Sequence, residues 1–85
     1  MRRSREEILF GILKSCAYDR LSVYQIMISQ NLSYKLLKSC LDRLAKSKLV
    51  SLDVEERRKV VGTTRAGLDA LKHYRNALSL LHEKF

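Results

Sequence analysis

The stretch NLSYKLLKSCLDRLAKSKLV, from Asn31 to Val50, decides the fold. Ser33 can cap a helix there, because its hydroxyl can accept a hydrogen bond from an amide two or three residues further on. Behind this cap, apolar residues recur at helical spacing and form an inward face, while polar residues form the opposite face. The inward residues are Leu37, Cys40, Leu41 and Leu44, and the outward residues are Tyr34, Lys35, Lys38, Ser39, Asp42, Arg43 and Lys46.

The outward face of this helix carries four cations and two neutral donors against a single carboxylate. A helix that is held by a core on one side and offers donors on the other suits a DNA groove, so we interpret it as a recognition helix. Lysines mostly contact phosphates, which carry no sequence information. Arg43 is the better candidate for reading a guanine edge. The alternative interpretation of these charges is an ordinary solvated face.

Composition favours one small, mostly helical domain. The chain has 85 residues, of which 46% are hydrophobic and 31% charged, with no proline, a balance typical of a folded protein. The net charge of +8 indicates an anionic partner, either nucleic acid or a membrane surface. No uncharged run is long enough to span a bilayer, and the charged start lacks the pattern of a secretory signal. We therefore expect a cytoplasmic protein.

Catalytic and metal-binding chemistry has little support in the sequence. Cys16 and Cys40 lie on the apolar faces of two different predicted helices, and we expect buried free thiols rather than a disulfide in a reducing compartment. His73 and His82 would point to opposite sides of one helix and could not share a metal. No glycine-rich phosphate loop is present. We expect no enzymatic activity, no cofactor, no metal and no small-molecule substrate.

The segment before the recognition helix predicts two further helices. Ser4 and Glu7 form a capping box that starts the first helix, which should continue to about Tyr18. Gly11 costs about 1 kcal/mol of helix propensity relative to alanine, so it can mark a close approach of another helix. The arginines around this helix start are interpreted as a solvated terminus, with a phosphate-contacting arm as the alternative: Arg2, Arg3 and Arg5.

The second helix should run from Val23 to about Ser29, capped by Ser22. It carries no charge, and its apolar residues occupy much of its circumference, so we expect it to be buried between neighbours. The short connection from Gln30 to Leu32 then leads into the recognition helix. Two short helices joined by such a turn form a helix-turn-helix.

The pattern changes after Lys48. Val50, Leu52 and Val54 alternate with polar residues, as in a strand that is half-buried on one face. Residues 59–63 form a second β-rich run, and the charged residues 55–58 lie between the two runs. We expect a hairpin with a charged tip, although no Asn-Gly or Asp-Gly pair defines its turn.

The last helix should begin at Arg65, capped by Thr64, and continue to near the C-terminus. Its apolar residues are spaced alternately by four and three, which is a heptad pattern. Because so short a chain has little core left to cover the distal leucines, we expect a homodimer through this helix; the alternative is that the helix folds back on its own core. The heptad positions are Gly67, Leu71, Tyr74, Leu78, Leu81 and Phe85.

In its order of elements, the chain resembles small archaeal winged-helix DNA-binding proteins, including chromatin-associated ones that dimerise through a C-terminal antiparallel coiled coil. The resemblance covers nearly the whole chain, and two departures matter. Cys40 stands where the family often has an aromatic residue. Lys48 stands where it often has a glycine, which puts the end of the recognition helix in doubt. The motifs that carry the resemblance are Leu32-Ser33-Tyr34, then Leu37, Leu41 and Leu44, then Leu49-Val50, and Thr64 followed by Gly67.

The resemblance implies a mainly α protein with a small β-hairpin (α+β), comprising a winged helix-turn-helix domain over 1–63 and a coiled-coil dimerisation helix over 64–85. It implies binding to double-stranded DNA by a homodimer, as a nucleoid-associated chromatin component or in transcription regulation. The implied dimer contacts are Leu71, Tyr74, Leu78, Leu81 and Phe85. The implied DNA contacts are Ser33, Tyr34, Lys35, Lys38, Ser39 and Arg43 on the helix and Arg57, Arg58 and Lys59 on the wing.

Charge alone favours the recognition helix over the wing as a contact surface. The wing holds three cations and three carboxylates, so the surplus within residues 33–59 belongs to the helix. One alternative function is a protein-interaction module in a larger assembly, whose basic face meets an acidic partner. Another is attachment to anionic membranes through a basic amphipathic helix, which we rank last because the apolar face of the most basic helix is committed to the core.

Overall fold

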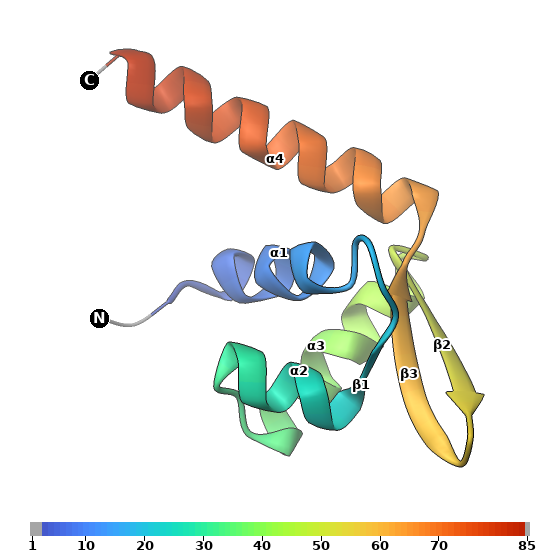
Figure 1. The fold of residues 1–85 in the computed structure, drawn as a ribbon. Helices are drawn as coiled ribbons and strands as arrows, with labels where there is room; N and C mark the ends of the chain where they lie inside the picture. Colours follow the sequence, from blue (N-terminus) through green and yellow to red (C-terminus); the bar gives the residue numbers. More distant parts are fainter. Residues whose placement is uncertain (1–2, 85) are drawn as a thin grey trace.

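The computed structural model describes residues 3–84, with side chains to residue 81, and contains four helices and three strands. Figure 1 shows α1, α2 and α3 packed together, a hairpin extending beside them, and α4 running from the top of the hairpin over α1. This arrangement confirms the expected mainly α, α+β fold. The elements are α1 (Arg5–Ser15), β1 (Leu21–Ser22), α2 (Val23–Gln30), α3 (Tyr34–Lys46), β2 (Val50–Glu55), β3 (Arg58–Thr63) and α4 (Arg65–Lys84).

The first three helices begin at the predicted caps. Ser4 and Ser22 each accept a hydrogen bond from the backbone amide of the residue three positions on, and the Glu7 and Gln25 side chains return the bond in two complete capping boxes. Ser33 caps α3 through its hydroxyl alone. Helix α1 ends at Ser15, about one turn earlier than expected. The residues after it are needed as a connection to β1.

A lysine occupies the left-handed position that ends α3. Lys48 has φ 60°, a conformation that favours glycine. The Leu49 amide donates to the Leu44 carbonyl at 2.8 Å, and the Lys48 amide donates to the Ala45 carbonyl at 2.9 Å. This pair of bonds is a Schellman motif. The helix therefore ends where the family glycine would place its end, although the residue is not a glycine.

The sheet has three antiparallel strands in the order β1-β3-β2. Strand β1 was not predicted, because two residues are too few to show an alternating pattern. In β2 only Val50 is buried, while Leu52 and Val54 are 50% and 70% exposed. The expectation of a strand that is half-buried along its length is therefore wrong beyond its first residue, because the hairpin extends past the helices (Figure 1).

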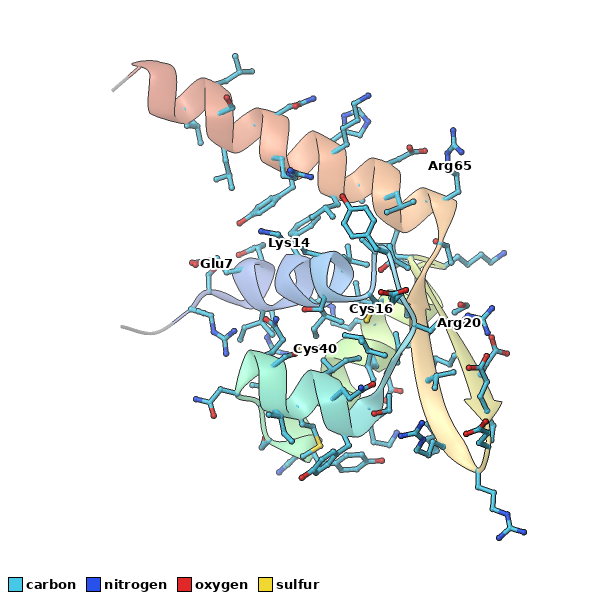
Figure 2. The ribbon with its side chains drawn as sticks, viewed as in Figure 1. Glu7, Lys14, Cys16, Arg20, Cys40 and Arg65 are labelled. Carbon is cyan, nitrogen blue, oxygen red and sulfur yellow. The ribbon has the colours of Figure 1, made fainter. Side chains whose placement is uncertain are left out.

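The core lies between α1, α2, α3 and the base of the sheet, and its innermost side chains include Ile12, Leu37 and Val61. Helix α2 contributes Ile26 but exposes Tyr24 and Ile28. The prediction that α2 is buried between neighbours is therefore wrong: it has an inner face and an open, uncharged outer face. The side chains of all elements are drawn in Figure 2.

Gly11 lies against the Gln30 side chain of α2, so the approach expected at this glycine is made by a side chain and not by the helix backbone. A Cβ at this position would lie 2.7 Å from the Gln30 side-chain oxygen. The Gln30 amide donates to the Ser15 hydroxyl at 2.7 Å, and Arg3 donates to the Gln30 side chain and backbone carbonyl. Arg3 therefore closes the end of α2, where a cation is favoured, and is neither a free terminus nor an outstretched arm.

The start of α4 contacts, backbone to backbone, the residue just before β2. A Cβ on Gly67 would lie 2.2 Å from the Leu49 carbonyl oxygen. The Thr64 hydroxyl accepts from the Gly67 amide at 3.1 Å and donates to the Lys48 carbonyl at 2.7 Å. Only glycine therefore fits at position 67, because any side chain would force α4 away from the base of the hairpin.

Both cysteines are buried free thiols, as expected. Burial raises the pKa of the Cys16 thiol to about 11, while a hydrogen bond donated by the Leu21 backbone to the sulfur acts in the opposite direction. The neutral thiol therefore predominates at neutral pH. Cys40 lies beneath Arg5, whose guanidinium is 3.9 Å from its sulfur.

Replacing Gly67 with alanine should destabilise the fold by about 2–3 kcal/mol or more, because the new Cβ meets a backbone carbonyl that cannot swing away. Gly11→Ala is the matched control. Its Cβ meets only the end of the flexible Gln30 side chain, and alanine recovers about 1 kcal/mol of helix propensity. Urea unfolding followed by circular dichroism compares the two; equal effects would contradict the backbone contact at Gly67.

Replacing Lys48 with glycine should stabilise the protein by roughly 0.5–1 kcal/mol. Glycine removes the strain of a left-handed residue that carries a Cβ, and this gain exceeds the entropy that glycine adds to the unfolded chain. Lys48→Ala removes the same charge but keeps the Cβ, so it should give no such gain. The measurement is the urea midpoint at unchanged slope. A gain in both variants would indicate that charge, and not backbone conformation, is responsible.

Candidate nucleic-acid interface

The outward side of α3, here called the α3 face, is exposed along its whole length. All seven of its residues are open to solvent, whereas the four inward residues at the same turns are at most 6% exposed. The helix is therefore fixed in rotation about its axis by its own apolar side. The α3 face consists of Tyr34, Lys35, Lys38, Ser39, Asp42, Arg43 and Lys46.

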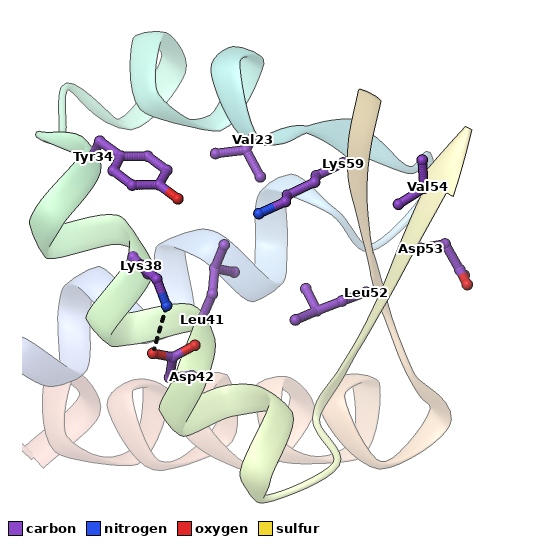
Figure 3. A pocket seen from close by; sticks show the side chains of 9 residues that line it. All are labelled: Val23, Tyr34, Lys38, Leu41, Asp42, Leu52, Asp53, Val54 and Lys59. Atoms are coloured by element: carbon purple, nitrogen blue, oxygen red, sulfur yellow. Dashed lines mark hydrogen bonds and ion pairs between the residues drawn. The ribbon is translucent and has the colours of Figure 1, made fainter. Parts of the chain in front are cut away.

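One ion pair modifies the charge of the α3 face. The Lys38 ammonium lies 3.3 Å from a carboxylate oxygen of Asp42, one turn further along the helix (Figure 3). Both side chains are more than half exposed, so the pair is worth only a few tenths of a kcal/mol. An incoming anion could therefore displace Asp42 from Lys38 at little cost. Lys35, Arg43 and Lys46 form no ion pair within the described residues.

The hairpin turns through two residues in an unusual conformation. Glu56 and Arg57 have φ values of 49° and 67°, as the central residues of a type I′ turn require. This turn normally selects asparagine and glycine, so here a charged pair occupies it against backbone preference. Arg57 is thereby placed at the tip, the most outlying position of the hairpin.

The two remaining hairpin cations lie on opposite faces of the sheet, because neighbouring residues of a strand alternate. Lys59 pairs with Val54 and faces the groove between the hairpin and α3, where it lies across from Tyr34 and Lys38 (Figure 3). Arg58 pairs with Glu55 on the outer face, beside the start of α2. Of the predicted wing contacts, only Lys59 is therefore brought together with the α3 face.

The groove between α3 and the hairpin has a volume of about 220 Å³, and its floor is apolar (Figure 3). Leu52 and Val54 of the hairpin, which are half or more exposed, face Leu41 and Tyr34 of α3 across it. Lys38 and Lys59 lie at its margins. Asp42 and Asp53 also line it, so the groove offers apolar contacts between margins of mixed charge.

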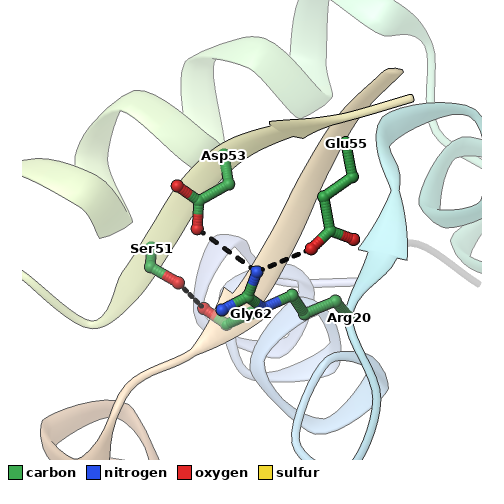
Figure 4. A network of polar contacts seen from close by, with 5 residues as sticks. All are labelled: Arg20, Ser51, Asp53, Glu55 and Gly62. Atoms are coloured by element: carbon green, nitrogen blue, oxygen red, sulfur yellow. Dashed lines mark hydrogen bonds and ion pairs between the residues drawn. The ribbon is translucent and has the colours of Figure 1, made fainter. Parts of the chain in front are cut away.

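Arg20 was missed as a candidate residue by sequence reasoning. It lies before β1, and its guanidinium Nη1 is 2.8 Å from a carboxylate oxygen of Glu55 and 3.5 Å from one of Asp53 (Figure 4). The sequence did indicate that a cation was needed nearby, because Asp53 and Glu55 are two residues apart in β2 and so lie on one face of the strand. Only the pairing of β1 with β3 shows which cation reaches them.

The predicted dimer contacts of α4 have different surroundings within the chain. Leu71 is 6% exposed, and the Tyr74 ring stacks on Phe10 of α1 with their centroids 4.0 Å apart. Leu78 and Leu81, further along, are 38% and 55% exposed. Phe85 lies outside the described residues. Only the first half of helix α4 therefore packs against the core of its own chain.

Neither a metal cluster nor a membrane-spanning helix is found in the part of the chain that the structure describes. The side chains of residues 3–81 include no group of three or more able to hold a metal ion. None of the described helices combines the length and apolar content that crossing a membrane requires.

Comparison with solved structures finds the same fold in several DNA-related proteins. The crystal structure of the transcriptional regulator BldR from Sulfolobus solfataricus matches with a TM-score of 0.83 at 20% identity, covering 91% of this chain and 58% of that one. Sso10a-2, a DNA-binding protein from the same organism, matches with a TM-score of 0.77 at 21% identity, covering 96% and 88%. A Staphylococcus aureus MepR variant bound to an oligodeoxyribonucleotide matches with a TM-score of 0.76 at 20% identity, covering 89% and 57%.

The chain thus spans somewhat more than half the length of BldR and MepR but most of the length of Sso10a-2. No curated protein sequence matches it. A sequence profile of the winged helix-turn-helix family matches residues 2–82, nearly the whole chain. Together with the helix order, the exposed face of α3 and the hairpin described above, this match shows that the chain belongs to the winged helix-turn-helix family.

Proposed function

We propose that this protein is a regulator or chromatin-associated factor that binds double-stranded DNA as a homodimer. The observation that carries the proposal is the α3 face, whose four cations and one carboxylate all lie open to solvent above a buried apolar anchor. A rigid basic helix of this kind fits the major groove, where backbone contacts give affinity and base contacts give specificity.

The residues of the α3 face would divide these tasks. Lys35 and Lys38 suit phosphate contacts, and Lys38 would exchange Asp42 for a phosphate oxygen. The hydroxyls of Ser39 and Tyr34 can donate to backbone or base, and Ser33 lies at the start of the helix. Arg43, one turn before the end of α3, has the forked donors that recognise guanine.

The hairpin would add contacts to the flanking DNA. Arg57 at the tip and Lys59 in the groove would meet phosphates beside the segment that α3 occupies, and Arg58 on the outer face would reach a phosphate further along the flank. The fold likeness to Sso10a-2, a DNA-binding protein, and to a DNA-bound MepR variant supports this role for a winged helix of this shape.

We further propose that dimerisation uses the second half of α4, with Leu78 and Leu81 as its centre. These two side chains are exposed in the isolated chain, whereas Leu71 and Tyr74 are occupied by its own core. Burying two leucines from each copy removes apolar surface from water at about 25 cal/mol per Å². A symmetric pair would also present two α3 faces to one duplex.

A protein-interaction module is the second candidate function, and the groove between α3 and the hairpin favours it. Leu52 and Val54 remain largely exposed there, although a strand in a free domain gains by covering such residues. A partner segment with an apolar side chain between polar residues would fit the groove, whose margins carry both lysines and aspartates.

Replacing Lys35, Lys38 and Arg43 together with alanine should weaken DNA binding at physiological salt by about 100-fold or more. The log–log salt dependence should become shallower by about 1.8, because Lys35 and Lys38 no longer neutralise phosphates and each lost phosphate contact reduces the slope by about 0.9. Fluorescence anisotropy with a labelled duplex, titrated at several salt concentrations, measures both quantities.

The control is the triple variant Lys14→Ala, Lys72→Ala and Arg75→Ala, which removes the same charge from exposed positions on α1 and α4. It should bind within a few-fold of the parent. Equal loss in both triple variants would mean that net charge alone drives binding, and no loss in the α3 variant would refute the assignment of α3. Salt-insensitive capture of one protein partner without DNA binding would favour the second candidate.

Replacing Leu78 and Leu81 with aspartate should convert a dimer into a folded monomer, because both side chains are exposed within the chain and buried only in the proposed pair. Light scattering at micromolar concentration gives the mass, and circular dichroism checks that the fold remains. Ser79→Asp, which adds a charge on a different side of the same turn, should leave the dimer intact. A parent protein that is monomeric at this concentration would refute the proposed dimer.

A further inference from the structure

The outer face of the hairpin carries a charge arrangement that the DNA-binding proposal does not yet explain. The hairpin alone contains three cations and three carboxylates, so it is neutral. Two of those carboxylates, Asp53 and Glu55, lie on the outer face of β2, and both contact Arg20 from the connection before β1 (Figure 4). With Arg20 included, the balance is four cations against three carboxylates.

Arg20 reaches these carboxylates by crossing β3. Strand β3 lies between β1 and β2, so a side chain from the start of β1 must pass over it. The crossing occurs at Gly62, where a Cβ would lie 3.3 Å from the Arg20 side-chain Cγ. Gly62 therefore leaves the space in which Arg20 lies against the sheet, and the contact is part of how the strands are arranged.

The contact between Arg20 and Glu55 also determines which cation Glu55 pairs with. Glu55 and Arg58 are directly opposite each other in the β2-β3 register, and such pairs have Cβ atoms about 5 Å apart, close enough for an ion pair. In the structure, however, the Glu55 carboxylate lies 2.8 Å from Arg20, and Arg58 forms no ion pair within the described residues. Arg20 competes successfully for the carboxylate that would otherwise neutralise Arg58.

We propose that Arg20 is a positioning residue for DNA binding, which holds Asp53 and Glu55 on the sheet and so keeps Arg58 available for a backbone phosphate. The inference rests on the proposed function, and it adds the α1–β1 connection to the parts of the chain that DNA binding requires. Without Arg20, Glu55 pairs with Arg58, and Asp53 is left as an uncompensated carboxylate beside the DNA.

The test is a set of charge variants measured by anisotropy with a random-sequence labelled duplex. Arg20→Gln should weaken binding about three- to tenfold at low salt, the effect of about one effective charge near the phosphates. Arg65→Gln is the matched control, because it also removes the cation of an exposed ion pair, with Asp69, but on α4. It should change affinity less than about twofold, since its charge lies away from the DNA-contacting surface.

Rescue separates this role from a merely structural one. Adding Asp53→Asn and Glu55→Gln to Arg20→Gln should restore binding to the parental level or above, because the carboxylates that Arg20 holds are then gone and the variant is one charge more positive than the parent. Arg20→Lys should retain most of the affinity. Arg58→Gln should cost less in the Arg20→Gln background than in the parent, because Glu55 has already neutralised Arg58 there.

Each outcome decides the proposal. Binding by Arg20→Gln that equals binding by Arg65→Gln overturns the role of Arg20, while the α3 face stands as a separate question answered by its own triple variant. Failure of the carboxylate replacements to rescue binding assigns Arg20 to fold stability alone and likewise overturns it. A parent protein that does not bind the duplex overturns the proposed function together with this inference.

Discussion

The burial of one side of α3 is the constraint on which the rest of the structure depends. Leu37 and Cys40 are completely buried, and Leu41 and Leu44 nearly so, which leaves the helix a single orientation about its axis. Its cations face solvent because the leucines on the opposite side of the helix are buried in the core. The other elements serve this packing: α1 and α2 supply its partners, and the Schellman motif at Lys48 fixes where the helix stops and the hairpin begins.

The sequence specifies local features well when a single residue controls them. The serine caps of the first three helices, the free buried cysteines and the two faces of α3 were all predictable, because each follows from periodicity or from one side chain and its neighbours. The end of α3 was not predictable, since Lys48 disfavours the left-handed conformation that it adopts. There the tertiary structure overrides the local preference.

Features that depend on pairing across the fold could not be predicted in this way. Strand β1 has only two residues, so its existence follows from the register of β3 and not from its own sequence. Arg20 therefore looked like a loop residue, although it contacts two carboxylates on β2. The open outer face of α2 and the exposed end of the hairpin were missed for a related reason: apolar residues predict burial only where another element is present to cover them.

The contact between Gly67 and the Leu49 carbonyl couples the long helix to the base of the hairpin without any intervening side chain. Such a joint has little freedom to tilt, because neither partner carries a rotamer that could absorb the movement. In the proposed pair, the distance between the two recognition helices would then depend on this joint as well as on the leucines that hold the copies together. The spacing of half-sites along a duplex would therefore be as rigid as the contact at this glycine.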